Sequence, residues 1–341
     1  MPDLDKDTIG DFVKRFRVAP GTRVRLPRDF DPGDTAGWKE SDAEGLLAEG
    51  IELLSDYQSR LAAQDTQSLL VIIQAIDAAG KDGTIRHVMS GVNPQGVSVS
   101  SFKVPSHEEM DHDFMWRYQR ALPGRGMIGI FNRSYSEELL VVRVHPAILE
   151  GQKLPAEKKD QGIWTRRFRQ VNEWEAYLSD QGYTIVKLFL NLSRDEQRKR
   201  FLARIDEPDK NWKFSAADVK ERQHWDDYQA AFADVLSRSS TAVAPWHVIP
   251  ADNKWFARIA AAGVIADALI RMDPQYPVVG EQARAALLAA RAELLAEDGG
   301  STPDEAAAAD APRAGGKAAK RNGRSGAGKG KGRKAKGAKG R

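Results

Sequence analysis

The sequence predicts an α/β protein built around a parallel β-sheet of five strands. Five short apolar runs are continuous rather than alternating, which is typical of strands that are covered on both faces of a sheet. Helical patterns lie between the runs, and strands that alternate with helices indicate a doubly wound sheet. A small-residue loop ending in Gly80-Lys81 follows the first run, at the edge where such sheets bind ligands. The predicted strands are residues 69–73, 97–102, 127–131, 185–190 and 246–249.

The chain before the first strand divides into an arm and a helix. Residues 1–40 are rich in Asp, Gly, Pro and Arg and are predicted to form an irregular N-terminal arm. Ser41 and Glu44 have the spacing of a capping box, which predicts that a helix begins there. Apolar residues then recur at helical spacing as far as Leu61, so this helix leads directly to the first strand.

Later helices also carry start signals. Ser106 with Glu109 and Ser193 with Glu196 form further capping-box patterns, and Ser215 is expected to cap another helix. Between the fourth and fifth strands, residues 198–230 carry many cations and few core positions. This segment is predicted to be a mobile lid over phosphates, although a solvated pair of helices would have the same composition.

The C-terminal part differs in composition from the rest. Residues 273–298 are predicted to hold a C-terminal helix, with an Ala- and Leu-rich pattern over 281–297. Residues 299–341 have almost no apolar side chain larger than Ala, so we expect them to be disordered. From residue 313 the tail carries 12 Lys and Arg and no acid, whereas the preceding part has 39 Lys and Arg against 48 Asp and Glu.

Composition also restricts the class of protein. Cysteine is absent, which excludes disulfides, thiolate metal sites and thiol nucleophiles. The acidic N-terminus has no signal-peptide pattern, and no apolar run is long enough to cross a bilayer. We therefore expect a cytoplasmic protein with no membrane partner.

The loop after the first strand has the features of a phosphate cradle. Backbone N–H groups, a helix N-terminus and the ammonium of Lys81 all attract phosphate. The pattern is irregular, because Ala75 replaces the usual Gly and Asp82 replaces the Ser or Thr that commonly holds magnesium. The alternative is an ordinary strand-to-helix turn. At the end of the third strand, Asn132 followed by Arg133 stands where many P-loop enzymes have a carboxylate.

Several separated motifs lie along residues 41 to 270. They are Ala75 to Gly83, Asn93-Pro94, Phe102 to Ser106, Phe131 to Tyr135, Trp212-Lys213-Phe214 and Pro245 to Val248. Together they resemble the polyphosphate kinase 2 family. The resemblance implies a three-layer P-loop kinase fold with a helical lid, similar to thymidylate kinases, for a catalytic domain over 41–272. It also implies reversible transfer of the terminal phosphate of inorganic polyphosphate to AMP and/or ADP, with Mg²⁺ or Mn²⁺.

The class within the family follows from the same comparison. The run over residues 80–96, Asn132 and residues 142–146 resemble the third class, which phosphorylates both AMP and ADP. The family also suggests a homodimer or homotetramer. Two other functions remain open: an ATP-dependent nucleoside monophosphate kinase on the same fold, and a polyanion-binding protein without catalysis.

Roles for the site residues follow from the phosphate chemistry and from the resemblance. We expect catalysis by Asp77, Lys81 and Arg133, with Asp77 as a magnesium ligand or acceptor-positioning carboxylate rather than only a loop-shaping one. Glu137, or less favourably Glu138, would supply a second carboxylate. Expected nucleotide-side candidates are Lys103, Arg117 and Asn132. Expected phosphate-binding residues are Ala79, Gly80, Lys81, Asp82, Gly83 and Thr84 in the loop, with Arg200, Arg204, Lys210, Lys213 and Arg222 in the lid.

The basic tail has three interpretations. It could hold polyphosphate by nonspecific charge, it could hold nucleic acid, or it could be a solubilising extension without a ligand. No aromatic residue lies between the charges, so stacking on bases is not expected and nucleic acid is not the main predicted function.

Overall fold

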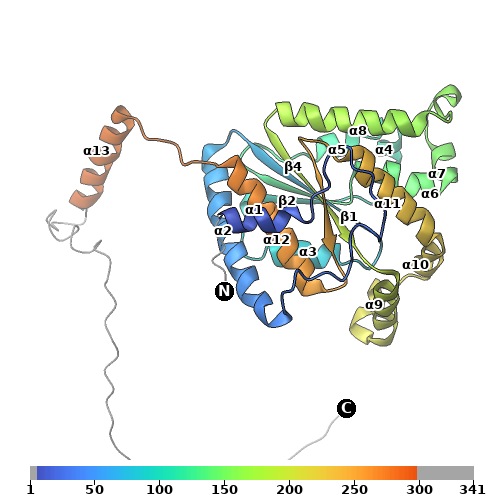
Figure 1. Cartoon of the computed structure of the whole chain (residues 1–341). Coiled ribbons are helices and arrows are strands. Elements are labelled where there is room, and N and C mark those ends of the chain that lie inside the picture. The colour runs from blue at the N-terminus through green and yellow to red at the C-terminus, as the bar shows by residue number, and fades with distance from the viewer. Residues whose placement is uncertain (1–5, 298–341) are drawn as a thin grey trace, which may run out of the picture. The chain divides into compact units, whose positions relative to one another are not determined.

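The computed structural model describes residues 6–297 and confirms the predicted parallel sheet of five strands. The strand order is β2-β3-β1-β4-β5, and each strand end lies within two residues of its expected position (Figure 1). The central strand β1 is buried at all eight of its positions, as its continuous apolar sequence requires. The strands are β1 (Ser68–Ala75), β2 (Val97–Ser101), β3 (Ile128–Asn132), β4 (Tyr183–Asn191) and β5 (Trp246–Pro250).

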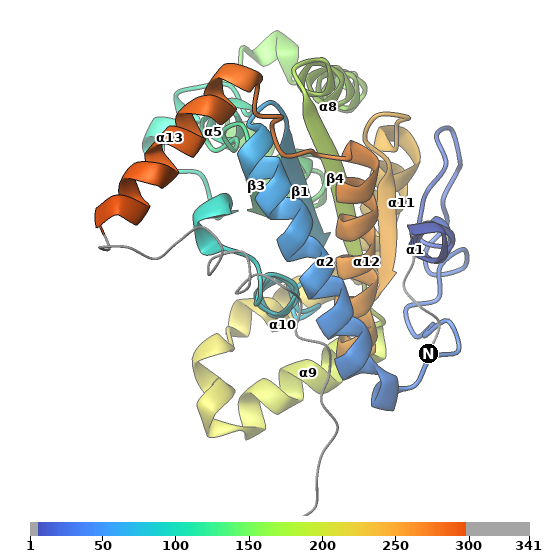
Figure 2. The same ribbon diagram turned by 90° about the vertical axis from the view of Figure 1, so that its left-hand side faces the viewer.

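Helices cover both faces of the sheet, which gives the expected three layers. On one face, α12 (Lys254–Met272) packs against α2 (Ala43–Gln64) and α3 (Lys81–Val88). On the other face, α8 (Ile163–Asp180) and α11 (Trp225–Ser239) pack together (Figure 2). Many of the buried positions of α12 are alanine, and these small side chains let the helix approach its neighbours closely.

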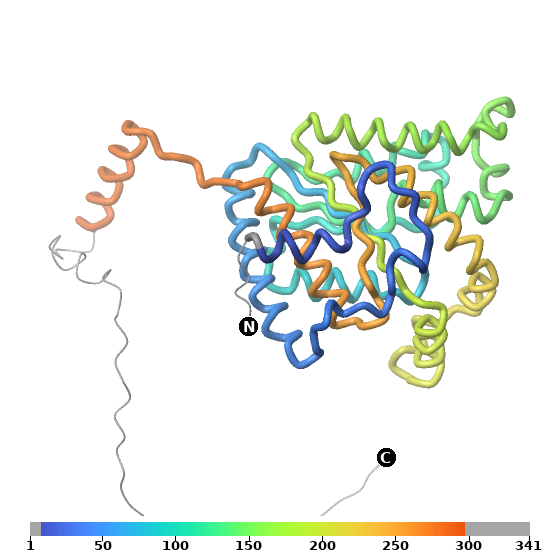
Figure 3. The backbone as a smooth tube through the Cα atoms, in the orientation of Figure 1, coloured from blue at the N-terminus to red at the C-terminus, as the bar shows by residue number. Residues whose placement is uncertain are grey.

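The N-terminal arm is not wholly irregular, which corrects the prediction. Residues Lys6–Lys14 form helix α1, and Ile9 and Val13 are buried in the main core. After the helix, the chain runs antiparallel to β5, and the peptide N–H of Val18 donates to Trp246 O at 2.8 Å (Figure 3). The apolar spacing of this helix is hidden in the sequence by the Asp, Gly and Arg residues around it.

The start signals of the helices were only partly correct. Ser106 and Glu109 form a complete capping box at α4 (His107–Met110). Ser193 caps α9 (Arg194–Asp206) by accepting from the N–H of Glu196 at 3.1 Å, but its own N–H donates to Asp252 instead.

Ser41 does not cap α2, because a short 3-10 turn, η1 (Glu40–Asp42), precedes that helix and Asp42 takes the N-cap position. Ser215 does cap the helix that follows it, by accepting from the N–H of Ala217. The remaining short elements are η2 (Pro94–Gly96), α5 (Trp116–Arg120), η3 (Tyr135–Leu139), α6 (Val141–Val144), α7 (Pro146–Gly151) and η4 (Ala156–Lys158).

The predicted lid corresponds to a group of short helices beyond the carboxyl edge of the sheet (Figure 2). It starts within α9 and continues through η5 (Pro208–Lys213), α10 (Ala216–Glu221) and η6 (Arg222–His224). The prediction placed its end at residue 230, and from Ala231 onward α11 is buried in the core. The segment therefore joins the body at both of its ends.

The C-terminal helix α13 (Glu281–Glu297) belongs to a separate unit that begins at Val278. The helix covers the Ala- and Leu-rich pattern but not residues 273–280, which are not helical. The predicted disordered tail over 299–341 lies outside the described residues. Within residues 6–297, no helix is long and apolar enough to cross a membrane, and the cytoplasmic location stays a prediction.

Candidate active site

The loop between β1 and α3 lines a cleft of about 950 Å³ at the carboxyl edge of the sheet. Ala78 and Gly80 have positive φ angles of 64° and 103°, so the backbone reverses its direction within a few residues. A φ of 103° suits glycine, because a side chain is strained there. Helix α3 begins at Lys81, and the free N–H groups of its first turn lie beside the cleft. Every loop residue expected to bind phosphate, from Ala79 to Thr84, lines this cleft.

Lys81, Asp77 and Arg133 meet at this loop, as the sequence predicted. Lys81 Nζ donates to Ala75 O at 3.1 Å, so its ammonium folds back over the loop. Burial, followed by the charge of Arg133, lowers the pKa of Lys81. Arg133 has a positive φ of 67°, and its Nη2 lies 3.2 Å from Asp77 Oδ1. Both side chains remain about one-third exposed, which leaves them accessible to a ligand.

The choice between Glu137 and Glu138 is decided by their contacts. Glu138 is buried, pairs with Arg167 and accepts from Gln152 Nε2 at 2.9 Å, so it has a structural role. Glu137 lies near the loop: burial raises its pKa, and the charges of Arg133 and Lys81 oppose that rise. Glu137 is therefore the carboxylate closer to the loop, although it does not line the cleft, and its role as a second carboxylate stays a prediction.

The cleft is strongly cationic. Eleven Lys and Arg side chains line it against four Asp and Glu, which favours a ligand with several negative charges. Four predicted cations lie on its wall: Arg204, Lys210 and Lys213 from the lid, and Lys103 after β2.

Two predicted phosphate or nucleotide ligands lie elsewhere. Arg222 does not line the cleft, because its Nη1 donates to Gln197 Oε1 at 2.7 Å and to Arg194 O at 2.8 Å. Arg117 lies over the ring of Phe102 beside Glu109 and is almost buried, so it supports packing rather than ligand binding. Both predictions were based only on the positive charge of the side chain. They did not anticipate the hydrogen-bond acceptors beside Arg222 or the ring of Phe102 beside Arg117.

Arg200 borders the cleft, but its guanidinium faces protein atoms. Its Nη1 donates to Ala79 O at 2.9 Å, its Nη2 donates to Ala251 O at 2.6 Å, and only 7% of the side chain is exposed. Arg200 therefore binds the loop itself, and this does not support the prediction that it binds the phosphate chain.

Asn132 and Asp82, which both line the cleft, form a hydrogen bond with each other. Asn132 Nδ2 donates to Asp82 Oδ1 at 2.7 Å, and the other amide atom, Oδ1, is buried without a hydrogen-bond partner among the described residues. Asp82 is therefore engaged where a P-loop Ser or Thr would face magnesium. Asn132 remains a candidate on the nucleotide side, because it lines the cleft.

Sequence reasoning missed four cations of the cleft. Lys199 lies on α9, Arg86 on α3, and Lys254 and Arg258 lie one turn apart at the start of α12. Within residues 6–297, Arg86, Lys254 and Arg258 form no salt bridge, and Glu196, which is more distant, is the acid whose charge acts on Lys254. The signal available in the sequence was a pair of cations at positions i and i+4 at the start of a mostly apolar helix.

The charges are distributed unevenly along the cleft. Carboxylates gather around Arg133, where Asp77 raises the pKa of Asp218 after the effect of burial. Away from them, burial and then the charges of Arg200 and Lys210 lower the pKa of Lys254. One part of the cleft thus offers carboxylate oxygens beside an arginine, and in the other the cations outnumber the two acids, Glu196 and Glu207.

Comparison with known proteins agrees with this arrangement. The sequence model of the family Polyphosphate kinase 2 matches residues 38–277. An ADP-polyphosphate phosphotransferase of Rhodopseudomonas palustris is 51% identical over 287 residues, covering 83% of this chain and 98% of the relative. An AMP/ADP-polyphosphate phosphotransferase of Meiothermus ruber is 40% identical over 267 residues, covering 78% of this chain and 96% of the relative.

A solved structure supports the same assignment. The crystal structure of polyphosphate kinase 2 from Arthrobacter aurescens superposes with a TM-score of 0.72 at 39% sequence identity. It covers 82% of this chain and 96% of that chain. The sequence match, the fold and the cationic loop site agree, and we conclude that this chain belongs to the polyphosphate kinase 2 family.

Proposed function

We propose that this protein transfers the terminal phosphate of inorganic polyphosphate to AMP and ADP, in a reversible reaction. The observation that carries the proposal is the cleft itself, in which cations outnumber acids by eleven to four around a phosphate-binding loop. A polyphosphate donor has no base, so its site needs cations and N–H groups rather than an adenine pocket. The names of the two relatives above, which act on polyphosphate with ADP or with AMP and ADP, support the same choice.

The distribution of charge suggests how the two substrates lie. We place the donor chain along Arg86, Lys254 and Arg258, with its terminal phosphate in the loop beside Lys81. The nucleotide phosphate then approaches from the part that holds Asp77 and Arg133. Its oxygen forms the new P–O bond while the bond to the chain breaks, and the polyphosphate leaves one unit shorter.

This reaction needs little acid–base catalysis. The nucleotide phosphate is already ionised near neutral pH, so the barrier lies in bringing anions together and stabilising the transferring group. Lys81 and the loop N–H groups bind the phosphate being transferred, and the planar guanidinium of Arg133 matches its oxygens. The contact between Arg133 and Asp77 holds that guanidinium in place before substrate binds.

Asp77 lines the carboxylate-bearing part of the cleft and would hold a magnesium ion there, with Glu137, buried behind the lining and close to Lys81 and Arg133, as the second carboxylate. No three His, Asp or Glu side chains within residues 6–297 are grouped to hold a metal by themselves. This suits Mg²⁺, which commonly takes one or two carboxylates and completes its shell with substrate phosphates and water. When bound, the ion would neutralise phosphate charge. Mn²⁺ could take the same oxygen ligands.

The test is product analysis with long-chain polyphosphate and Mg²⁺ in the absence of ATP. We expect ATP from ADP, and ADP followed by ATP from AMP, measured by chromatography of the nucleotides. Formation of ADP only when ATP is supplied with AMP would favour a nucleoside monophosphate kinase and contradict the proposal. Polyphosphate binding without turnover would instead favour a polyanion-binding protein. The expected homodimer or homotetramer is checked by light scattering on the same preparation.

A further inference from the structure

Helix α9 holds three successive carbonyl groups of the phosphate loop. Gln197 Nε2 donates to Asp77 O at 3.0 Å, and Arg200 Nη1 donates to Ala78 O at 3.1 Å and to Ala79 O at 2.9 Å. Gln197 and Arg200 are three positions apart, so they project from the same side of the helix. Two side chains of one helix turn therefore reach the loop together.

The guanidinium of Arg200 has no donor left for a ligand. An arginine carries five N–H groups. Besides the two loop carbonyls, Arg200 donates from Nε to Glu196 Oε1 at 3.0 Å and from Nη2 to Ala251 O and Asp252 O at 2.6 Å and 3.0 Å. All five N–H groups thus have protein acceptors, and Arg200 joins the loop to the segment that leads into α12.

Fixing these carbonyls fixes the direction of the loop N–H groups. The C=O and N–H of one planar trans peptide point in opposite directions. The carbonyls of residues 77 to 79 belong to the same peptides as the N–H groups of residues 78 to 80. Holding the first set towards α9 therefore sets the orientation of the second. The N–H of Ala79 donates to Ile76 O at 3.4 Å, and the N–H groups of Ala78 and Gly80 are of the kind that a phosphate loop uses to bind anions.

Gln197 is itself held at its other end. Its Oε1 accepts from Arg222 Nη1 at 2.7 Å, and Gln197 is buried. The side-chain amide of Gln197 therefore donates one hydrogen bond to the loop and accepts one from Arg222. The second bond explains why Arg222, which was expected to bind the phosphate chain, faces the base of the lid instead.

We propose that Gln197 and Arg200 are positioning residues that hold the phosphate loop in its binding conformation without touching phosphate. The proposal rests on the phosphotransferase function for its kinetic test, but its geometry does not depend on the identity of the donor. It assigns to the first lid helix a role in shaping the loop rather than in gripping the polyphosphate chain.

The decisive comparison is between Arg200→Lys and Arg200→Ala. A lysine keeps the charge but cannot reproduce the fork that serves five acceptors. If Arg200 positions the loop, both variants lose kcat to a similar extent, by about 100-fold. If Arg200 binds phosphate directly, the lysine variant stays close to wild type while the alanine variant raises KM for polyphosphate, and that outcome overturns the proposal.

Two neighbours on the same helix serve as matched controls. Arg204 lines the cleft one turn later, and its contacts with Lys213 O and Asp218 are long, at 3.4 Å. For Arg204 we expect the opposite pattern, with lysine retaining activity and alanine raising KM for polyphosphate. Arg198 lies on α9 outside the cleft, and Arg198→Ala should leave both kinetic constants unchanged.

A second variant and a binding measurement keep the proposal independent of folding and of the assigned activity. Gln197→Met removes only the bonds to Asp77 O and Arg222, and we expect about a tenfold loss of kcat. Calorimetry with tripolyphosphate and no nucleotide should show equal weakening for Arg200→Lys and Arg200→Ala. If wild type binds tripolyphosphate but transfers no phosphate, the proposed function fails while this comparison still decides the role of Arg200. Unchanged kcat in a folded Gln197→Met variant would contradict the role given to Gln197.

Discussion

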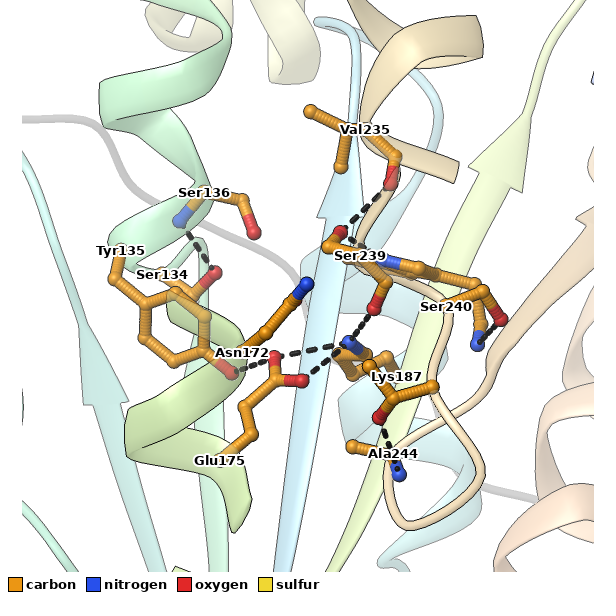
Figure 4. A network of polar contacts seen from close by, with 12 residues as sticks. Ser134, Tyr135, Ser136, Asn172, Glu175, Lys187, Val235, Ser239, Ser240 and Ala244 are labelled. Carbon is orange, nitrogen blue, oxygen red and sulfur yellow. Dashed lines mark hydrogen bonds and ion pairs between the residues drawn. The ribbon is translucent and has the colours of Figure 1, made fainter. Parts of the chain in front are cut away.

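Cationic side chains have different surroundings in the cleft and in the core of this fold. In the cleft, Arg86, Lys254 and Arg258 form no salt bridge within residues 6–297. In the core, Lys187 is fully buried, and its Nζ lies 2.7 Å and 2.9 Å from the two carboxylate oxygens of Glu175 (Figure 4). The other hydrogen bonds of this pair are also made with protein groups. Lys187 donates to Ser239 O, and the hydroxyl of Tyr135 donates to Glu175 at 2.6 Å.

The difference follows from access to water. A buried charge loses its hydration and must be matched by an opposite charge and hydrogen bonds. The cleft stays partly hydrated, so cations can remain together there until an anion binds. In this fold the cleft therefore holds cations without a salt bridge as well as paired ones such as Arg133, whereas the buried Lys187 of the core has all its partners in the protein.

The largest expected effect comes from breaking the core pair. Glu175→Leu leaves Lys187 buried without its carboxylate and should cost about 3–5 kcal/mol of unfolding free energy. Replacing both partners, as Glu175→Leu with Lys187→Met, should recover most of that loss, because no buried charge remains. Urea unfolding of the three proteins measures both values. A single variant as stable as wild type would show that this pair is not buried as described.

Removing a cleft cation should damage activity and spare the fold. Lys81→Ala is expected to lower kcat by about 10²–10³-fold, the effect of losing one preorganised group that stabilises transferring charge. The melting temperature should not fall, because burial already lowers the pKa of this ammonium and its removal relieves desolvation. Steady-state kinetics measures the loss of kcat, and calorimetry measures the melting temperature. A variant that unfolds would contradict the prediction that this cleft cation is dispensable for the fold.

The buried His247 extends the comparison to pH. Burial, followed by the positive charge of Arg271, lowers its pKa from 6.5 to about 3. Between these two pKa values the unfolded chain therefore binds a proton at His247 and the folded chain does not. The free energy of unfolding falls as the pH drops from about 6.5 towards 3. Between pH 6.5 and 4.5 this group should remove about 2.3 kcal/mol. Urea midpoints against pH, with His247→Gln as a non-titrating reference, should show a shallower slope in the variant.

The smallest effect is expected for one hydrogen bond to the core pair. Tyr135→Phe removes a bond to a buried carboxylate and should cost about 1.5 kcal/mol. Tyr183→Phe is the matched control, because its hydroxyl donates to a neutral carbonyl, Pro123 O, at 3.0 Å and should cost about 0.5–1 kcal/mol. Equal losses in the two variants would mean that the charge of Glu175 adds nothing to the bond.

The sequence predicted the sheet well because its strands are continuous apolar runs bounded by polar residues. It predicted the loop equally well, since Gly80 and Lys81 are adjacent in the chain and need no tertiary information. Helix α1 was missed because its apolar positions, such as Ile9 and Val13, alternate with residues common in loops.

The roles of individual cations were harder to predict. Charge alone placed Arg200 and Arg222 on the ligand, whereas their acceptors are backbone and amide groups brought together by folding. Lys254 and Arg258 join a cleft that begins more than 170 residues earlier in the chain, and only the packing of α12 beside α3 reveals them. Residue type and spacing predict a chemistry, but which of several arginines performs it depends on neighbours from distant segments.

The contact between the N-terminal arm and β5 has a consequence for how the protein is made. The arm leaves the ribosome before β5, whose edge it covers, and the paired residues Arg17 and His247 are 230 positions apart in the chain. Phe12 of α1 can stack on Trp38 early, but α12, the helix on which α1 packs, follows β5 in the chain. Until β5 is made, the outer edge of β4 is open to wrong pairing. The sheet and the packing of α1 are therefore both completed only by the C-terminal part of the domain.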